Sequence, residues 1–252
     1  MGRWNSYFHH SNIRMVARME QGNLRYLTPT SIIDSDHQSI QDYAHGVIGK
    51  CTDPIEIAVK LYLAARDGIR YDPYTPFYLP HHYRASNVLY RGRGFCVPKA
   101  SLLCALGRAC GIPSRVGFAT VRNHLATKQL IAFIGSDLFV YHGFVEFYLE
   151  EKWVKTTPAF NIELCQKHHV PPLEFNGRDD SLFQAYNLEN KKFMEYVEFH
   201  GIETDIPVDR IVESWMKAYG EARVKSWIKQ FEETEGQSLS HFEEEEVIQF
   251  LR

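Results

Sequence analysis

The sequence predicts an α+β fold in which a helix that begins at a cysteine packs on an antiparallel sheet. Residues 54–68 and 97–109 have apolar side chains at helical spacing, whereas residues 114–122 and 139–157 alternate and are rich in β-branched and aromatic side chains. The helices precede the strands instead of alternating with them, which favours the α+β class over parallel βαβ units. The chain has 252 residues, of which 44% are hydrophobic, so a large core can be buried.

Composition excludes several kinds of partner and site. The formal net charge of −3 provides no bulk attraction for nucleic acid. No apolar run reaches the roughly 18 residues of a membrane span, and the N-terminus has no apolar segment typical of a secretion signal. We therefore expect a cytoplasmic protein with neither nucleic acid nor membrane as a partner. The five cysteines show no C-x-x-C spacing, so we expect reduced thiols and no metal or other cofactor.

Local signals divide the chain into a core with two extensions. Residues 1–50 mix turn formers with short apolar pieces and predict an irregular N-terminal extension. The first helix begins after Asp53, which is suited to the N-cap, with Pro54 in its first turn. Residues 70–90 are rich in proline and tyrosine and predict a long loop. The core, at 51–165, would contain both helices and the sheet.

The C-terminal extension, residues 166–252, is predicted to be a loop followed by a helix over 209–231. Its acidic run, Glu243 to Glu246, is typical of a solvated helical turn. We expect the extension to pack on the core.

The strands after the second helix predict a hairpin with a two-residue turn at Glu150–Glu151. In this register the opposed residues are Tyr148 with Trp153 and His142 with Ala159. Thr157 and Asn161 then point to the same face as His142, each two positions from its direct partner. Pro158 is expected to end the regular pairing.

Cys96 is the candidate nucleophile because it stands where the second helix begins. The partial positive charge of a helix start favours an ionised sulfur, and the Cys96 N–H is free to bind an oxyanion. Cys104 and Cys110, inside the same helix, have the apolar surroundings of buried structural cysteines, which is also the alternative for Cys96. Further positive charge near Cys96 is expected from Arg91, Arg93 and Lys99.

His142 is the candidate base. It interrupts the apolar strand "FVYHGFVEFYL", where an imidazole is costly without a partner or a chemical task. The next residue, Gly143, would leave space for a substrate chain. A hydrogen-bonded core histidine is the alternative interpretation.

The segments "GFCVPKASLLCALGRACGIPSRVGF" and "YHGFVEFYLEEKWVKTTPAFN" together resemble the transglutaminase-like superfamily, over about residues 54–162. The resemblance implies a papain-like α+β core and a Cys–His–Asp triad that acts on amide bonds, with Cys96 as nucleophile and His142 as base. Thr157 stands where the superfamily usually has aspartate, and a hydroxyl can orient an imidazole but brings no charge. Asn161 is the second candidate for this third position, because an amide oxygen can also orient the ring. A bacterial branch is similar through "GFATVRNHLAT" and "WVKTTPAFN", which extends the resemblance to about Phe199.

These observations predict a cysteine-dependent hydrolase or acyltransferase that works through a thioester on a protein, a peptide or a small amide. Oxyanion or substrate contacts are expected from the backbone at Gly94 and Gly143 and from the side chains of Asn87 and Tyr90. One alternative is a non-catalytic binding module on the same fold. The other is a metalloprotein that uses the scattered cysteines and histidines.

Overall fold

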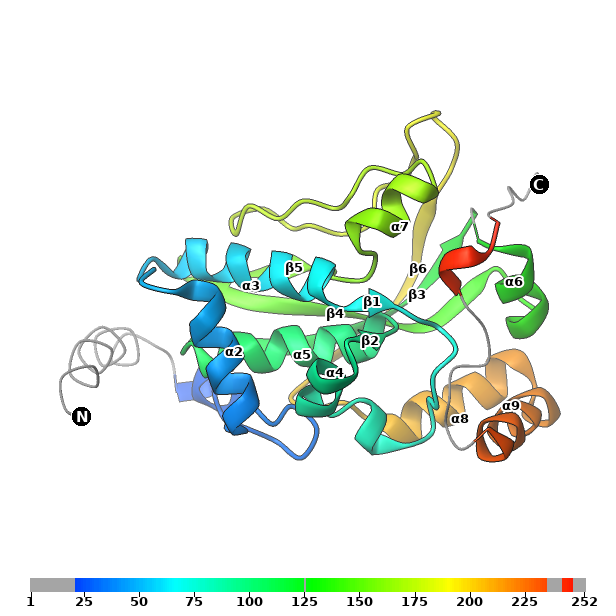
Figure 1. The fold of residues 1–252 in the computed structure, drawn as a ribbon, viewed down its shortest axis with the longest axis horizontal. Coiled ribbons are helices and arrows are strands. Elements are labelled where there is room, and N and C mark those ends of the chain that lie inside the picture. Colours follow the sequence, from blue (N-terminus) through cyan, green and yellow to red (C-terminus); the bar gives the residue numbers. More distant parts are fainter. Residues whose placement is uncertain (1–20, 125, 235–241, 247–252) are drawn as a thin grey trace.

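The computed structural model describes residues 21–124, 126–234 and 242–246, and it has helices packed against one antiparallel sheet (Figure 1). Its helices of more than three residues are η1 (Gln21–Tyr26), α2 (Gln38–Ile48), α3 (Pro54–Gly68), α4 (Ala85–Arg91), α5 (Cys96–Ala109), α6 (Lys128–Ile134), α7 (Ile162–Lys167), α8 (Val208–Tyr219) and α9 (Glu221–Glu233). Its strands are β1 (Arg70–Tyr71), β2 (Arg93–Gly94), β3 (Ser114–Asn123), β4 (Leu138–Leu149), β5 (Lys152–Thr156) and β6 (Met194–Glu203). Two short turns, η2 (Pro80–His82) and η3 (Phe242–Glu244), complete the described elements.

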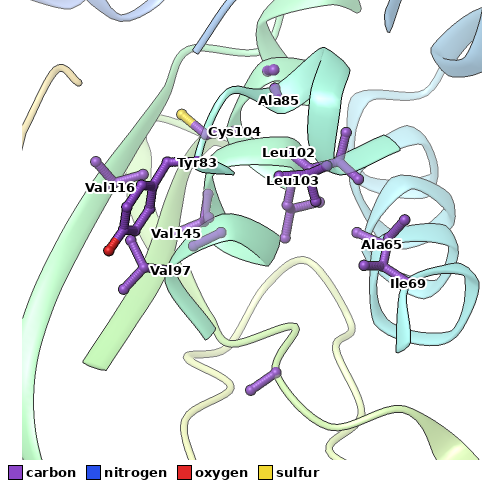
Figure 2. Close-up of a cluster of buried hydrophobic side chains, with 14 of the residues drawn as sticks. Ala65, Ile69, Tyr83, Ala85, Val97, Leu102, Leu103, Cys104, Val116 and Val145 are labelled. Atoms are coloured by element: carbon purple, nitrogen blue, oxygen red, sulfur yellow. The ribbon is translucent and has the colours of Figure 1, made fainter. Parts of the chain in front are cut away.

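The main sheet has the order β5-β4-β3-β6, with every neighbouring pair antiparallel, and α5 packs along β4 and β3. Residues 97–108 of α5 are all buried, and Leu102 and Leu103 lie in one core with Val116 of β3 and Val145 of β4 (Figure 2). This arrangement is the α+β class that the helix-then-strand order predicted.

Two predicted elements form for the predicted reasons. The Asp53 carboxylate accepts a hydrogen bond from the Glu56 N–H at 2.8 Å and caps α3, with Pro54 in the first turn. The β4–β5 hairpin has its turn at Glu150 and Glu151, with φ of 46° and 64°. Its register pairs Tyr148 with Trp153, as predicted.

The hairpin ladder ends at the pair Val145–Thr156, before it reaches Pro158. The predicted pairing of His142 with Ala159 therefore does not form. Proline cannot donate to a ladder, so the chain leaves the sheet after Thr156.

Three segments differ from the prediction. The extension predicted as irregular contains α2, which buries Ile40, Ala44 and Ile48, a stripe too short to stand out in the sequence; residues 1–20 lie outside the described part. The predicted loop 70–90 contains most of α4. The predicted C-terminal helix is two helices separated by Gly220, with φ of 93°.

Strand β6 was not predicted at all. It is the edge strand beside β3, and most of its side chains are exposed or half-buried, so no apolar alternation marks it. The division into residues 1–50, 51–165 and 166–252 stays a prediction.

Candidate active site

Cys96 opens α5, and backbone N–H groups surround its sulfur. The N-cap residue Phe95 provides no side-chain cap, and Pro98 has no N–H, so the N–H groups of Cys96 and Val97 remain available at the helix start. These two groups and the N–H of Gly143 in β4 hydrogen-bond toward the thiol and lower its pKa. Burial has the larger effect, however, and it raises the pKa of Cys96 to about 11. In this structure the apolar surroundings therefore outweigh the helix start and disfavour the ionised sulfur.

The cations expected near the thiol are occupied elsewhere. Arg91 donates to the His82 carbonyl, and Arg93 pairs with Asp72. Lys99 is fully buried and donates to the carbonyls of Arg66 and Ile69 at 2.8 and 2.5 Å, at the C-terminal end of α3. None of the three is available to the Cys96 sulfur in this arrangement.

The two glycines near Cys96 allow close packing. A Cβ on Gly143 would lie 3.0 Å from the Val97 Cα, so this glycine lets α5 approach β4. The space expected there for a substrate chain is filled by Val97. A Cβ on Gly94 would lie 2.9 Å from the Pro98 Cβ, so the space beside Gly94 is filled by the first turn of α5.

His142 follows a bulge in β4. Between Phe139 and His142, β4 has one residue more than β3, and Tyr141 has φ of 60°. A bulge turns the following side chain to a new direction and is common beside active sites. Helix α8 secures this one: Trp215 donates to the Val140 carbonyl and Tyr219 accepts from the Val140 N–H, both at 2.8 Å.

The imidazole of His142 is 4% exposed, and burial lowers its pKa to about 3. Its ring lies 4.9 Å from that of Phe183 and 6.1 Å from that of Tyr196, between ring centroids. Among the described residues, its Nε2 has no hydrogen-bond partner. At neutral pH the site thus holds a neutral thiol and a neutral imidazole.

Cys96 and His142 line the same two cavities. The first has a volume of about 40 Å³ and also contacts Tyr71, Phe160 and Phe183. The second has a volume of about 50 Å³ and an aromatic wall that includes Phe77, Trp215, Tyr219 and Trp227. Both are large enough for a few waters and too small for a peptide, so a substrate requires the site to open.

Phe242 of η3 closes part of the first cavity. Its ring lies 5.4 Å from that of Tyr71. Glu245 anchors this segment, because its carboxylate is 4% exposed and accepts hydrogen bonds from the hydroxyls of Tyr74 and Thr127. The prediction of a solvated acidic run at Glu243–Glu246 is therefore wrong for Glu245. Figure 1 shows η3, the short red helix, beside α6.

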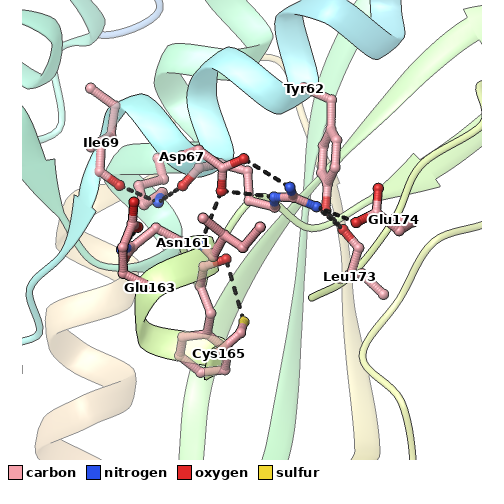
Figure 3. Close-up of polar contacts among 12 residues, drawn as sticks. Tyr62, Asp67, Ile69, Asn161, Glu163, Cys165, Leu173 and Glu174 are labelled. Carbon is pink, nitrogen blue, oxygen red and sulfur yellow. Dashed lines mark hydrogen bonds and ion pairs between the residues drawn. The ribbon is translucent and has the colours of Figure 1, made fainter. Parts of the chain in front are cut away.

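The two candidates for the third position differ in their surroundings. The Asn161 Oδ1 accepts from the Tyr71 N–H at 3.1 Å, and its Nδ2 donates to Glu163 at 2.8 Å (Figure 3). Asn161 thus holds the cavity wall at Tyr71. Thr157 is 1% exposed, and its Oγ1 makes no hydrogen bond of normal geometry within the part of the chain that the structure describes.

Asn87 and Tyr90 are not brought to Cys96. Asn87 donates to the His81 carbonyl at 2.9 Å, and Tyr90 is 92% exposed. Neither lines the two cavities that Cys96 lines.

Several site residues were not identified from the sequence. Cys165 lines the first cavity, and burial raises its pKa to about 11; His168 also lines it. Phe183, in a segment without regular structure, and Tyr196, in β6, contact His142. No local pattern marks these four.

The described residues were searched for metal-binding groups and for helices that could span a membrane. Across residues 21–124, 126–234 and 242–246, no group of three or more His, Cys, Asp or Glu side chains is arranged to hold a metal ion. Within the same residues, no helix has the length and apolar character needed to cross a bilayer.

The chain was compared with family models, curated proteins and solved structures. The family model of the transglutaminase-like superfamily matches residues 41–158, which confirms the resemblance seen in the sequence and the fold class it implies. A solved structure from Cytophaga hutchinsonii, named "Putative Cysteine Protease", is similar over 75% of this chain, with a TM-score of 0.46 and 18% sequence identity. That match covers 57% of the other chain, so this chain spans somewhat more than half of its length. No curated protein matched the sequence.

Proposed function

We propose that this chain, with its transglutaminase-like core, is a cysteine-dependent hydrolase or acyltransferase that cleaves amide or peptide bonds through Cys96 and His142. The observation that carries the proposal is their common position: both line the same two cavities, and three backbone N–H groups face the sulfur. The substrate class we propose is a protein, a peptide or a small amide. The free state of all five cysteines, each within the described residues, supports a reducing compartment such as the cytoplasm.

In the proposed reaction, His142 removes the thiol proton as the Cys96 sulfur attacks the carbonyl carbon. The carbonyl π electrons move to oxygen, and the N–H groups beside the sulfur are suited to hold that oxyanion. The tetrahedral intermediate collapses, the C–N bond breaks, and the proton on His142 goes to the leaving amine. Water or a second amine then attacks the thioester, gives its proton to His142, and Cys96 recovers a proton as it leaves.

The neutral state of both groups favours general-base attack over a preformed thiolate. Burial disfavours the charged forms of Cys96 and His142 alike, since it raises one pKa to about 11 and lowers the other to about 3. The proton therefore moves during the attack, when the charge that develops on the carbonyl oxygen can be stabilised.

A test uses p-nitrophenyl acetate, a small acyl donor whose leaving group is coloured. We expect wild type to release a burst of p-nitrophenolate, and Cys96→Ala and His142→Ala to abolish it. Cys51→Ala is a matched control that should retain the burst, because Cys51 is half-buried beside Asp53 and lines neither cavity.

Other outcomes would redirect the proposal. A burst lost with Cys165→Ala and kept with Cys96→Ala would make Cys165 the nucleophile. The second candidate function, a non-catalytic binding module, is favoured by the small closed cavities and by Thr157 at the aspartate position. A correctly folded wild type with no burst would support that module.

A further inference from the structure

Three buried polar atoms near His142 make no hydrogen bond of normal geometry with any described residue. They are His142 Nε2, Thr157 Oγ1 and Tyr196 Oη. Buried polar groups without a partner are rare in folded proteins, because each loses its bonds to water and gains nothing in return. One imidazole nitrogen and two neighbouring hydroxyls in this state indicate a site whose hydrogen bonds form during function.

The fold brings Tyr196 to His142 across β3. Tyr196 of β6 pairs with Val121 of β3, and Val121 lines the same cavity as His142. Ala119, the direct β3 partner of His142, has a single methyl group and leaves room above the strand. The ring of Tyr196 meets that of His142 edge to face, at 6.1 Å and 70°.

The hydroxyl of Tyr196 lies beside that of Thr157. Burial raises the pKa of Tyr196 to about 12, while the Thr157 hydroxyl and the Phe183 N–H, which both lie close to the Tyr196 oxygen, lower it, and the Cys96 thiolate would raise it. Tyr196 is therefore a neutral hydroxyl at physiological pH, and its oxygen can accept a hydrogen bond from the imidazole Nε2–H, which leaves the other ring nitrogen to take the thiol proton.

We propose that Tyr196 is a positioning residue, whose hydroxyl acts with that of Thr157 to orient the His142 imidazole through Nε2. This inference rests on the proposed function of Cys96 and His142. The pair of hydroxyls takes the place of the carboxylate that the superfamily motif has at position 157. Because catalytic hydrogen bonds are often long in an unliganded enzyme, the three atoms come into contact when substrate binds and the ring settles.

Removing the Tyr196 hydroxyl distinguishes a role in orienting His142 from a role in stability. Tyr196→Phe removes an unpaired buried hydroxyl, so the thermal midpoint should stay or rise. If Tyr196 orients His142, the burst rate with p-nitrophenyl acetate should fall about tenfold with KM unchanged. The matched control is Tyr83→Phe: Tyr83 is fully buried, and its hydroxyl donates to the Phe77 carbonyl. That exchange should lower the thermal midpoint and leave the burst rate unchanged.

Rescue by a carboxylate tests the same geometry. Thr157→Asp, added to Tyr196→Phe, should recover the burst rate, since an aspartate can accept from the imidazole N–H. The carboxylate should also raise the pKa of His142 by favouring its charged form, so the acid limb of the pH–rate profile should move to higher pH. A merely structural tyrosine would not produce that shift.

The two failures are distinguishable. If Tyr196→Phe reacts as fast as wild type while Cys96→Ala and His142→Ala are inactive, the positioning role is wrong and the proposed function stands. If Cys96→Ala keeps the full burst, the proposed function fails first.

Discussion

Two groups of buried polar side chains in this protein differ in their hydrogen bonds: those of the first are satisfied, and those of the second are not. The first is the set of side chains around Lys99, which lies a single turn after Cys96 in α5. The Lys99 ammonium donates to two carbonyls at the end of α3. The neighbouring Arg66 donates to Asp67, to Glu174 and to the Leu173 carbonyl (Figure 3). The other surrounds His142, where three buried atoms lack a partner among the described residues.

The difference indicates that the group around Lys99 stabilises the fold, whereas the group around His142 serves a reaction. Around Lys99 the polar atoms join α3, α5 and the segment at Leu173, and Asp67 also accepts from the Ile162 N–H at the start of α7. Around His142 three buried atoms make no hydrogen bond of normal geometry with the residues that the structure describes, which reduces stability and is typical of groups kept for a reaction. Buried charge alone would not have distinguished the two groups.

The largest effect on stability is expected from removing a hydrogen-bond donor in the group around Lys99. Lys99→Met leaves the Arg66 and Ile69 carbonyls without their donor, so the free energy of unfolding should fall by about 3 kcal/mol. The burst rate per folded molecule should remain near that of wild type. Urea denaturation monitored by circular dichroism measures the first quantity. Unchanged stability with a lost burst would reverse the roles assigned to the two groups.

The free energy of unfolding should depend on pH through the buried His142 imidazole. The pKa of His142 is about 3 in the folded protein and about 6.5 in the unfolded chain, which therefore binds the proton first. The contribution of His142 to the free energy of unfolding is therefore fully present above pH 6.5. It decreases by about 1.4 kcal/mol per pH unit as the pH falls from 6.5 toward 3.

The matching variants are His142→Gln and Lys99→Met. Denaturation between pH 4 and 6 should show a smaller acid slope for His142→Gln and the wild-type slope for Lys99→Met, because burial lowers the pKa of Lys99 only to about 7 and its ammonium stays protonated in this range. Part of the slope should remain in His142→Gln, because burial also lowers the pKa of His82 to about 3 and that of His168 to about 4. An identical slope in wild type and His142→Gln would contradict the buried neutral imidazole.

The smallest effect concerns access. Phe242→Ala removes a wall of the first cavity and lets water reach the thiol, which should lower the pKa of Cys96 from about 11. Iodoacetamide should then alkylate Cys96 about fivefold faster at pH 8, since the thiolate is the reactive form. Cys104, fully buried in α5, is the internal reference. A rate equal to that of wild type would mean that Phe242 does not limit access.

The sequence was sufficient for the parts of the site that depend on local signals. The start of α5 at Cys96 follows from the position of Pro98, and the hairpin that carries His142 follows from its two-residue turn. Both depend on residues close in sequence, so a helical periodicity or a turn pattern is enough to predict them.

Long-range contacts were beyond local patterns. Tyr196 reaches His142 from an edge strand without apolar alternation, and Glu245 meets Tyr74 across 171 positions. Lys99 was assigned to the thiol because it is near in sequence, yet its ammonium extends to α3. Asn161 shared a face with His142 in the predicted register, but the ladder ended before that register reached it.

The central claim, that Cys96 and His142 act as a catalytic pair, is tested most directly by trapping the acyl-enzyme. The measurement is peptide mass spectrometry after a brief reaction with p-nitrophenyl acetate and an acid quench. We predict one acetyl group per chain on Cys96 in wild type and none on Cys96 in His142→Ala at the same time point. Acetylation spread equally over Cys51, Cys96 and Cys165, or unchanged in His142→Ala, would contradict the pair.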